Sequence, residues 1–134
     1  MELLLRELLK VLKAAGDKNR LRILKMLQHK DMCVCELSAA LGITQPSVSK
    51  HLSLLKEAGL VSDEREGQWI DYKLCREKVN HYAPVILKQL NAWVNDDPCV
   101  ERDRKTAASL CREEVCKKTS TSPQTSKRKG MKND

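Results

Sequence analysis

The sequence predicts a mainly α-helical protein with one small β-hairpin wing, a winged helix-turn-helix that assembles as a homodimer. Two helical segments joined by a glycine turn occupy residues 35–58, and two strand-like segments follow directly over residues 60–74. The composition agrees, because the 134-residue chain has no Phe and only two Trp and two Tyr. Its core must be built mostly from Leu, Val, Ile and Ala, which favours helices.

The first two predicted helices carry apolar side chains at helical spacing and no evident chemistry. Residues 2–14 are expected to form the first helix, which Gly16 ends. Residues 17–28 are expected to form the second helix, with Asp17 as its N-cap. We expect both to serve core and dimer packing. The apolar positions are Leu4, Leu5, Leu8, Leu9, Leu12 and Ala15 in the first helix and Leu21, Leu24 and Leu27 in the second.

The helix-turn-helix itself is predicted over residues 35–58. A short helix over residues 35–41 is followed by Gly42, which can adopt the positive φ that a sharp turn needs. Thr44 is a good N-cap for the next helix, which stops at Gly59. The two helices are expected to share a small core made of Leu37, Leu41, Ile43, Val48, Leu52 and Leu55.

A wing and a further helix follow the helix-turn-helix. Residues 60–65 and 69–74 each suit a strand, with a turn over residues 66–68 between them. A helix is then expected over residues 83–95. An apolar surface this broad near a chain end is typical of a contact with another subunit, so we expect a homodimer. The apolar residues are Val85, Ile86, Leu90, Trp93 and Val94.

The exposed side of the second motif helix favours DNA binding over simple packing. Its N-terminal part, which enters the major groove in a recognition helix, carries hydrogen-bonding side chains. Gln pairs with adenine edges, and Ser contacts bases or phosphates. Arg65 and Gln68 near the wing tip are weaker candidates for backbone or minor-groove contacts. The predicted DNA-reading residues are Gln45, Ser47, Ser49, Lys50 and His51; the alternative is an ordinary solvated face.

From Asp96 the composition becomes polar. We therefore expect a DNA-binding and dimerisation domain over residues 1–96 and a polar, Cys-containing tail over residues 97–134. Within this tail, residues 100–116 suit a weakly amphipathic helix. Residues 117–134 hold six Lys or Arg against one acid and are expected to be disordered. Because this end supplies most of the formal net charge of +7, charge alone does not identify a DNA-binding surface.

Six cysteines indicate metal or redox chemistry. The N-terminus lacks the apolar core and cleavage site of a signal peptide, and no apolar run approaches a membrane span. We therefore expect a cytoplasmic protein without a membrane partner, in a compartment that keeps thiols reduced. Paired acids, a phosphate loop and a nucleophile–base pair are not evident in the sequence, so we expect neither an enzyme nor a catalytic cofactor.

The sequence resembles the ArsR/SmtB family of metal-responsive repressors. The resemblance implies a homodimer that binds an inverted-repeat operator in double-stranded DNA and leaves it when an ion binds. Cys33-Val34-Cys35 looks like the inducer site of the arsenic-responsive branch, which implies that Cys33 and Cys35 bind As(III) or Sb(III). The resemblance covers about residues 8–95 and rests on residues 17–24, 32–37, 45–52 and 67–72.

One position departs from the arsenic-responsive pattern, in which a third cysteine follows three residues after the second. That position is Ser38 here, and a hydroxyl is a poor ligand for a soft ion. A third thiolate, if the site uses one, must come from elsewhere in the chain. The candidates are Cys75, Cys99, Cys111 and Cys116.

The spacing of Cys33 and Cys35 suggests how an ion could act as a switch. In a regular helix, residues two apart point about 200° away from each other. The pair can therefore hold one ion only where the start of the helix is extended or unwound. Such a change would move the helix that supports the recognition helix. The alternative is that both cysteines are small, half-buried packing residues.

Several inducers and mechanisms compete with arsenite. Soft thiolates also suit cadmium or lead, but sensors of these ions in the family typically add N-terminal cysteines, and residues 1–32 have none. The zinc-sensing branch uses Asp, His and Glu on its last helix, and residues 83–95 contain none of them. Two further alternatives are a redox sensor that forms a Cys33–Cys35 disulfide and a DNA-binding module without a ligand.

Overall fold

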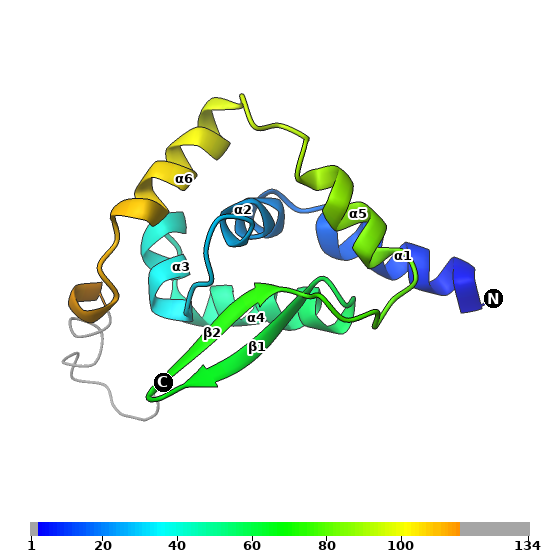
Figure 1. Cartoon of the computed structure of the whole chain (residues 1–134), viewed down its shortest axis with the longest axis horizontal. Helices are drawn as coiled ribbons and strands as arrows, with labels where there is room; N and C mark the ends of the chain where they lie inside the picture. The colour runs from blue at the N-terminus through cyan, green and yellow to red at the C-terminus, as the bar shows by residue number, and fades with distance from the viewer. Residues whose placement is uncertain (1–2, 116–134) are drawn as a thin grey trace.

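The described part of the protein consists of helices with one two-stranded hairpin packed at their side, which is the fold class that the sequence predicts. A computed structural model describes residues 3–115 (Figure 1). Strands β1 and β2 are antiparallel, with Val61 opposite Leu74 and Glu66 opposite Trp69. The elements are α1 (Leu3–Ala15), α2 (Lys18–Leu27), α3 (Val34–Leu41), α4 (Gln45–Glu57), β1 (Val61–Glu66), β2 (Trp69–Leu74), α5 (Ala83–Leu90) and α6 (Pro98–Ser109).

Helix α2 lies at the centre of the core. It contacts α1, α3, α4, α6 and β2, and Figure 1 shows it enclosed by the other elements. Its start is fixed by Asp17, whose carboxylate accepts hydrogen bonds from the amides of Asn19 (3.0 Å) and Arg20 (3.1 Å). The predicted N-cap is therefore confirmed. The largest fully buried apolar side chains are Val11, Ile23, Leu24, Met26, Met32, Leu37, Val48, Leu52, Leu55, Leu60 and Val61.

The turn between α3 and α4 forms as its sequence predicts. Gly42 has a φ of 72°, and its amide donates to the carbonyl of Ser38 at 2.9 Å, which ends α3. The Thr44 hydroxyl accepts from the Ser47 amide at 3.3 Å, which starts α4. Gly59 follows α4 with a φ of 79°, and a side chain there would press against Val79 and Asn80. The helix-turn-helix is thus confirmed.

Helix α5 is shorter than predicted. It ends at Leu90, so the expected helix over residues 83–95 was wrong in its second half, and Trp93 and Val94 lie in the following loop. The buried Lys25 holds this end of the helix, because its ammonium donates to the Leu90 carbonyl at 2.7 Å and to Asn95 Oδ1 in the loop at 2.8 Å. Burial lowers the pKa of Lys25. A long-range partner of this kind leaves no local pattern in the sequence.

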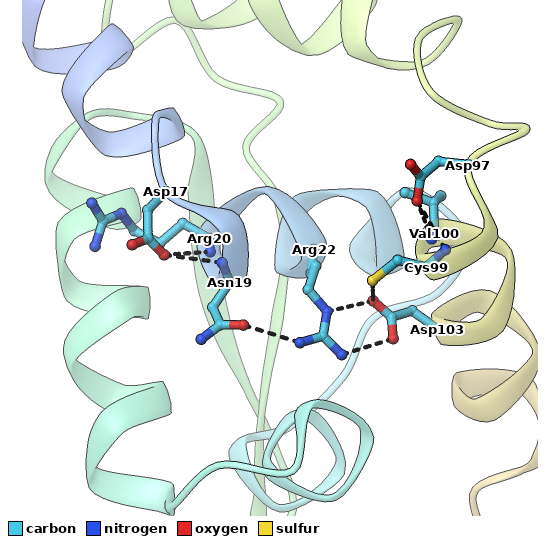
Figure 2. Close-up of polar contacts among 8 residues, drawn as sticks. All are labelled: Asp17, Asn19, Arg20, Arg22, Asp97, Cys99, Val100 and Asp103. Carbon is cyan, nitrogen blue, oxygen red and sulfur yellow. Dashed lines mark hydrogen bonds and ion pairs between the residues drawn. The ribbon is translucent and has the colours of Figure 1, made fainter.

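Helix α6 is docked on the core rather than separate from it. Arg22 of α2 donates to both carboxylate oxygens of Asp103, at 2.8 and 3.0 Å, and is held from the other side by Asn19 (Figure 2). At Leu110 the backbone becomes extended, with ψ 137°, and a helical turn follows over residues 112–115. One continuous helix over 100–116 was therefore wrong. The division at residue 96 stays a prediction, and residues 117–134 lie outside those described.

Large apolar side chains remain exposed on α1 and α5. Leu5 is 50% exposed and Val85 is 56% exposed. The loop before α5 is fastened to α1, because Asn80 Nδ2 donates to the Glu7 carbonyl at 3.0 Å. Helices α1 and α5 are therefore neighbours, and both expose apolar side chains to solvent in the monomer. Within residues 3–115, no helix has the length and apolar content needed to cross a membrane.

Candidate DNA-reading helix and thiol site

The N-terminal half of α4 presents a polar surface. Ser47, Ser49 and Lys50 are exposed, while Gln45 and His51 are half-buried. The buried side of the same helix carries Val48, Leu52 and Leu55, which hold it against the core. The five predicted DNA-reading residues therefore divide into three that face solvent and two that also contact other elements.

Gln45 links the start of α4 to a cysteine of α3. Its amide Nε2 donates to Cys35 Sγ at 3.6 Å. Sulfur is a weak acceptor, so this contact orients the side chain more than it stabilises the fold. It places a predicted DNA-reading residue directly against a predicted inducer ligand.

His51 is held from behind by the start of α2. Arg20 Nη1 lies 3.2 Å from His51 Nδ1, while its Nε donates to the Ala14 carbonyl at 2.7 Å. A guanidinium only donates hydrogen bonds, so Nδ1 acts as the acceptor and the ring proton lies on Nε2. The contact leaves Nε2 as the donor that His51 can offer to a further partner.

Cys33 and Cys35 lie on either side of the first residue of α3. Cys33 is the N-cap, extended with φ −92° and ψ 172°, and is only 4% exposed. Cys35 follows inside the first turn and is half-buried. The expected start of this helix at residue 35 was one residue late. Because Cys33 lies outside the helix with an extended backbone, the angle that separates residues two apart in a regular helix does not apply to this pair.

Glu36 lies at the centre of a buried group of charges next to Cys33. Its Oε1 accepts from the Cys33 amide at 3.0 Å, and its carboxylate is 3.5 Å from Arg112 Nη2 and 3.6 Å from Lys30 Nζ. Burial raises the pKa of Glu36, although the Cys33 amide, Arg112 and Lys30 oppose the rise. The residue that fixes the backbone of Cys33 therefore depends on two cations from other parts of the chain.

Arg112 connects the C-terminal segment to this group. Its guanidinium donates to Asp71 of β2 and lies over the Trp69 ring, 5.4 Å from the centroid. Burial alone lowers the pKa of Arg112, but Asp71, Glu36 and Cys33 together raise it above its ordinary value. Burial likewise raises the pKa of Asp71, against the effect of Arg112. No local pattern predicts this contact, since the partners of Arg112 are 41 and 76 residues away.

The remaining cysteines lie in different places. Cys75, buried after β2, donates from Sγ to the Glu77 carbonyl at 3.3 Å. Cys99 lies at the start of α6, 3.9 Å from Asp103 Oδ2 (Figure 2). Cys111 is exposed and follows α6, while Cys116 lies outside the described residues. Ser38 donates its hydroxyl to the Ile43 carbonyl at 2.5 Å, a role in the turn.

An open cleft lies between α3, α4 and the segment after α6, and we call it the thiol cleft. Within residues 3–115, no three His, Cys, Asp or Glu side chains stand close enough together to form a metal site. The cleft nevertheless brings two thiols from distant parts of the sequence to one surface. Its lining includes Cys35, Ser38 and Gln45 on one side and Leu110, Cys111 and Glu114 on the other.

The wing tip is accessible but its candidate residues are not organised into a site. Gln68 and Arg65 are exposed, and Arg65 Nη1 donates to the Gly67 carbonyl at 3.2 Å. Gly67 adopts a φ of 62°, which closes the turn. These two residues stay weaker candidates for contacts with a DNA backbone.

Comparison with known proteins agrees with this geometry. Residues 17–63 match the family described as bacterial regulatory protein, arsR family. The arsenic resistance transcriptional regulator ArsR1 of Pseudomonas putida is 37% identical over 92 residues, which cover 65% of this chain and 71% of that protein. The arsenical resistance operon repressor of Escherichia coli is 40% identical over 67 residues, covering 49% of this chain and 57% of the relative.

A solved structure shows the same architecture. The homodimeric winged helix-turn-helix DNA-binding domain of a possible ArsR-family regulator from Mycobacterium bovis superposes with a TM-score of 0.57. It is 27% identical, and the match covers 66% of this chain and 79% of that domain.

Proposed function

The chain belongs to the ArsR family of DNA-binding transcriptional regulators, and we propose that it is an arsenic-responsive repressor. In this proposal a homodimer binds operator DNA through Gln45, Ser47, Ser49, Lys50 and His51. Arsenite or antimonite then binds to Cys33 and Cys35 and releases the repressor. The single observation that carries the proposal is the contact between Gln45 and Cys35, because it joins the DNA-reading surface to the thiols.

The DNA-reading role rests on exposure and chemistry together. Ser47, Ser49 and Lys50 lie at the N-terminal end of a helix whose opposite side is buried, as docking into a major groove requires. Gln45 can read an adenine edge with its amide, and His51 offers Nε2 as a donor. Lys50 supplies a cation for a phosphate or a guanine edge.

The dimer is proposed from the uncovered apolar surface of α1 and α5. Symmetric operators are read by symmetric dimers, so one recognition helix would contact each half-site. The exposed leucines of α1 and Val85 of α5 provide apolar area for such a contact. The homodimeric state of the Mycobacterium bovis domain supports this assignment.

The ligands at the start of α3 fit a thiophilic ion. Thiolates are soft ligands and suit trivalent arsenic or antimony far better than Mg²⁺ or Ca²⁺, which prefer oxygen. Cys33 is kept outside the helix and Cys35 lies in the first turn, so both are near one point of the backbone. The names of the two bacterial relatives favour arsenic over cadmium or lead as the inducer.

Release would follow from a change at Cys35. When Cys35 binds an ion, its sulfur lone pairs are directed to that ion and its contact with Gln45 weakens. Gln45 then loses its support at the start of α4. Because α3 also packs directly against α4, a shift of the first turn of α3 reaches the whole DNA-reading surface. The ion lowers DNA affinity only through such a difference between the bound and free states.

A DNA-binding titration against a panel of ions tests this function. The panel contains arsenite, antimonite, cadmium, lead, zinc and peroxide, and the readout is the fraction of operator bound. Release by arsenite and antimonite at the lowest concentrations supports the proposal. Release by cadmium or lead alone would move the inducer to a divalent ion. Release by peroxide, reversed by a reductant, would support a thiol redox sensor instead.

A further inference from the structure

Cys111 lines the thiol cleft opposite Cys35, and the proposed two-cysteine site gives it no role. The proposed site offers two cysteines, whereas trivalent arsenic forms three bonds. Ser38 cannot complete it, because its hydroxyl is donated to the Ile43 carbonyl at 2.5 Å and is a poor ligand for a soft ion. Resting on the proposed function, we infer that Cys111 is the third thiolate, brought to Cys33 and Cys35 by the segment after α6.

The lining of the thiol cleft supports Cys111 directly. Cys35 and Ser38 lie one helical turn apart on α3 and line one side of the cleft, and Cys111 lines the other. Cys111 therefore lies near the part of α3 where the third cysteine of the arsenic-responsive pattern would project. Its thiol is exposed and donates to Glu113 Oε1 at 3.7 Å, a contact at the surface. It can therefore exchange that contact for an ion in the cleft without opening the core.

The next residue fixes this segment on the other side of α3. Arg112 is bonded to Asp71 and lies 3.5 Å from Glu36, the residue that accepts the Cys33 amide. Lys30 adds a second attachment, because its ammonium donates to the Ala107 carbonyl at 3.0 Å and pairs with Glu36. The chain at residues 111 and 112 thus passes from the cleft beside Cys35 to the charged group beside Cys33.

Neither of the other described cysteines, Cys75 and Cys99, lines the thiol cleft. Cys75 is buried behind β2, where its amide donates to the Leu60 carbonyl at 3.0 Å. Cys99 contacts Asp103 in the first turn of α6, whereas Cys111 follows the last turn of the same helix. Neither is therefore placed to share an ion with Cys35 in the cleft.

The binding step is a ligand exchange without oxidation or reduction. Arsenite, As(OH)₃, exchanges each hydroxyl for one cysteine sulfur. Each exchange breaks an As–O bond, forms an As–S bond and sends the thiol proton away with the hydroxyl as water. Arsenic stays trivalent throughout. With Cys111 as the third ligand, the ion would cross-link the C-terminal segment to the first turn of α3.

Arsenic X-ray absorption on the full-length protein tests the assignment, because it counts the sulfur neighbours of bound arsenite. We expect three sulfurs in the wild type and fewer in Cys111→Ser, with arsenite affinity reduced by more than about tenfold. Cys99→Ser is the matched control and should keep both values. Cys111 is exposed, so its substitution by serine leaves the fold intact.

The outcomes separate this inference from the proposed function. Two sulfurs in the wild type, or three in Cys111→Ser at unchanged affinity, would overturn the role of Cys111 and leave the Cys33–Cys35 site standing. The role of Cys111 would also be overturned if Cys116→Ser, and not Cys111→Ser, lowered the number of sulfur neighbours and the arsenite affinity. If the Cys33→Ser, Cys35→Ser double variant binds arsenite as the wild type does, the proposed function itself fails.

Discussion

The amide of Gln45, the first residue of α4, donates a hydrogen bond to the sulfur of Cys35 in the first turn of α3. The two residues belong to α3 and α4, the two helices of the helix-turn-helix, so this hydrogen bond joins the helices directly. A change in what the sulfur binds is therefore felt at the start of the recognition helix. The contact gives a short physical path from a thiol ligand to a base-reading side chain.

Removing the side chains at the start of α4 should weaken operator binding. Gln45→Ala or Ser47→Ala should each cost about 1–3 kcal/mol where it removes a base contact, and should relax specificity at one base pair. Fluorescence anisotropy with the operator and its single-base variants measures both effects. The control is Glu57→Ala at the far end of α4, an exposed position that should leave affinity unchanged. An unaltered affinity for the Gln45→Ala, Ser47→Ala double variant would mean that the surface is misassigned.

A charge on the apolar surface should dissociate the dimer. Leu12→Glu combined with Val85→Glu places two carboxylates on the exposed faces of α1 and α5, where burial against a partner would leave them unpaired. Light scattering at micromolar concentration should then report a monomer with reduced operator affinity. Ile70→Glu on the wing, a similarly exposed apolar position, should stay dimeric. A wild-type monomer that binds the operator fully would contradict the dimer.

The buried charge of Glu36 should appear in the pH dependence of stability. Its folded pKa is raised, mainly by burial, so the folded state holds its proton more tightly than the unfolded state. Between the ordinary glutamate pKa of 4.5 and the raised folded value, the free energy of unfolding should fall as the pH increases. Glu36→Gln should remove this contribution to the pH dependence of the free energy of unfolding. Urea denaturation of both proteins across this pH range measures the difference, and parallel curves would refute the buried charge.

Cutting the link between α2 and α6 should loosen the C-terminal segment. Asp103→Ala removes both hydrogen bonds from Arg22, and losing bonds to a charged group costs about 1.5–3 kcal/mol. We expect faster amide exchange in α6 and weaker arsenite binding, because Cys111 is positioned by this helix. Operator binding without arsenite should persist. Glu101→Ala, an exposed acid of the same helix, is the matched control. Unchanged exchange in α6 would show that the ion pair does not hold it.

Local signals in the sequence were sufficient for the motif, because Gly42, Thr44 and the apolar spacing of α3 and α4 each act within a few residues. Cys33 and Cys35 are also recognisable as a closely spaced pair in the sequence, and their role as inducer ligands stays a prediction. Long-range contacts were not predictable. Lys25 satisfies the carbonyl at the end of α5 from 65 residues away, and the expected helix to residue 95 was wrong. Arg112 and Cys111 approach α3 because α6 docks on the core through long-range contacts such as Arg22–Asp103 and Lys30–Ala107, and neither partner marks the other in the sequence.

The most direct test of the account is operator binding measured against arsenite concentration for the wild type, Cys33→Ser and Cys35→Ser. Serine is a favoured N-cap residue and is close in size to cysteine, so both variants should fold and bind DNA. They lack the sulfur that a soft ion needs. We predict normal operator affinity in both and no release at arsenite concentrations that free the wild type. Release of the Cys33→Ser, Cys35→Ser double variant at the wild-type concentration would contradict the account.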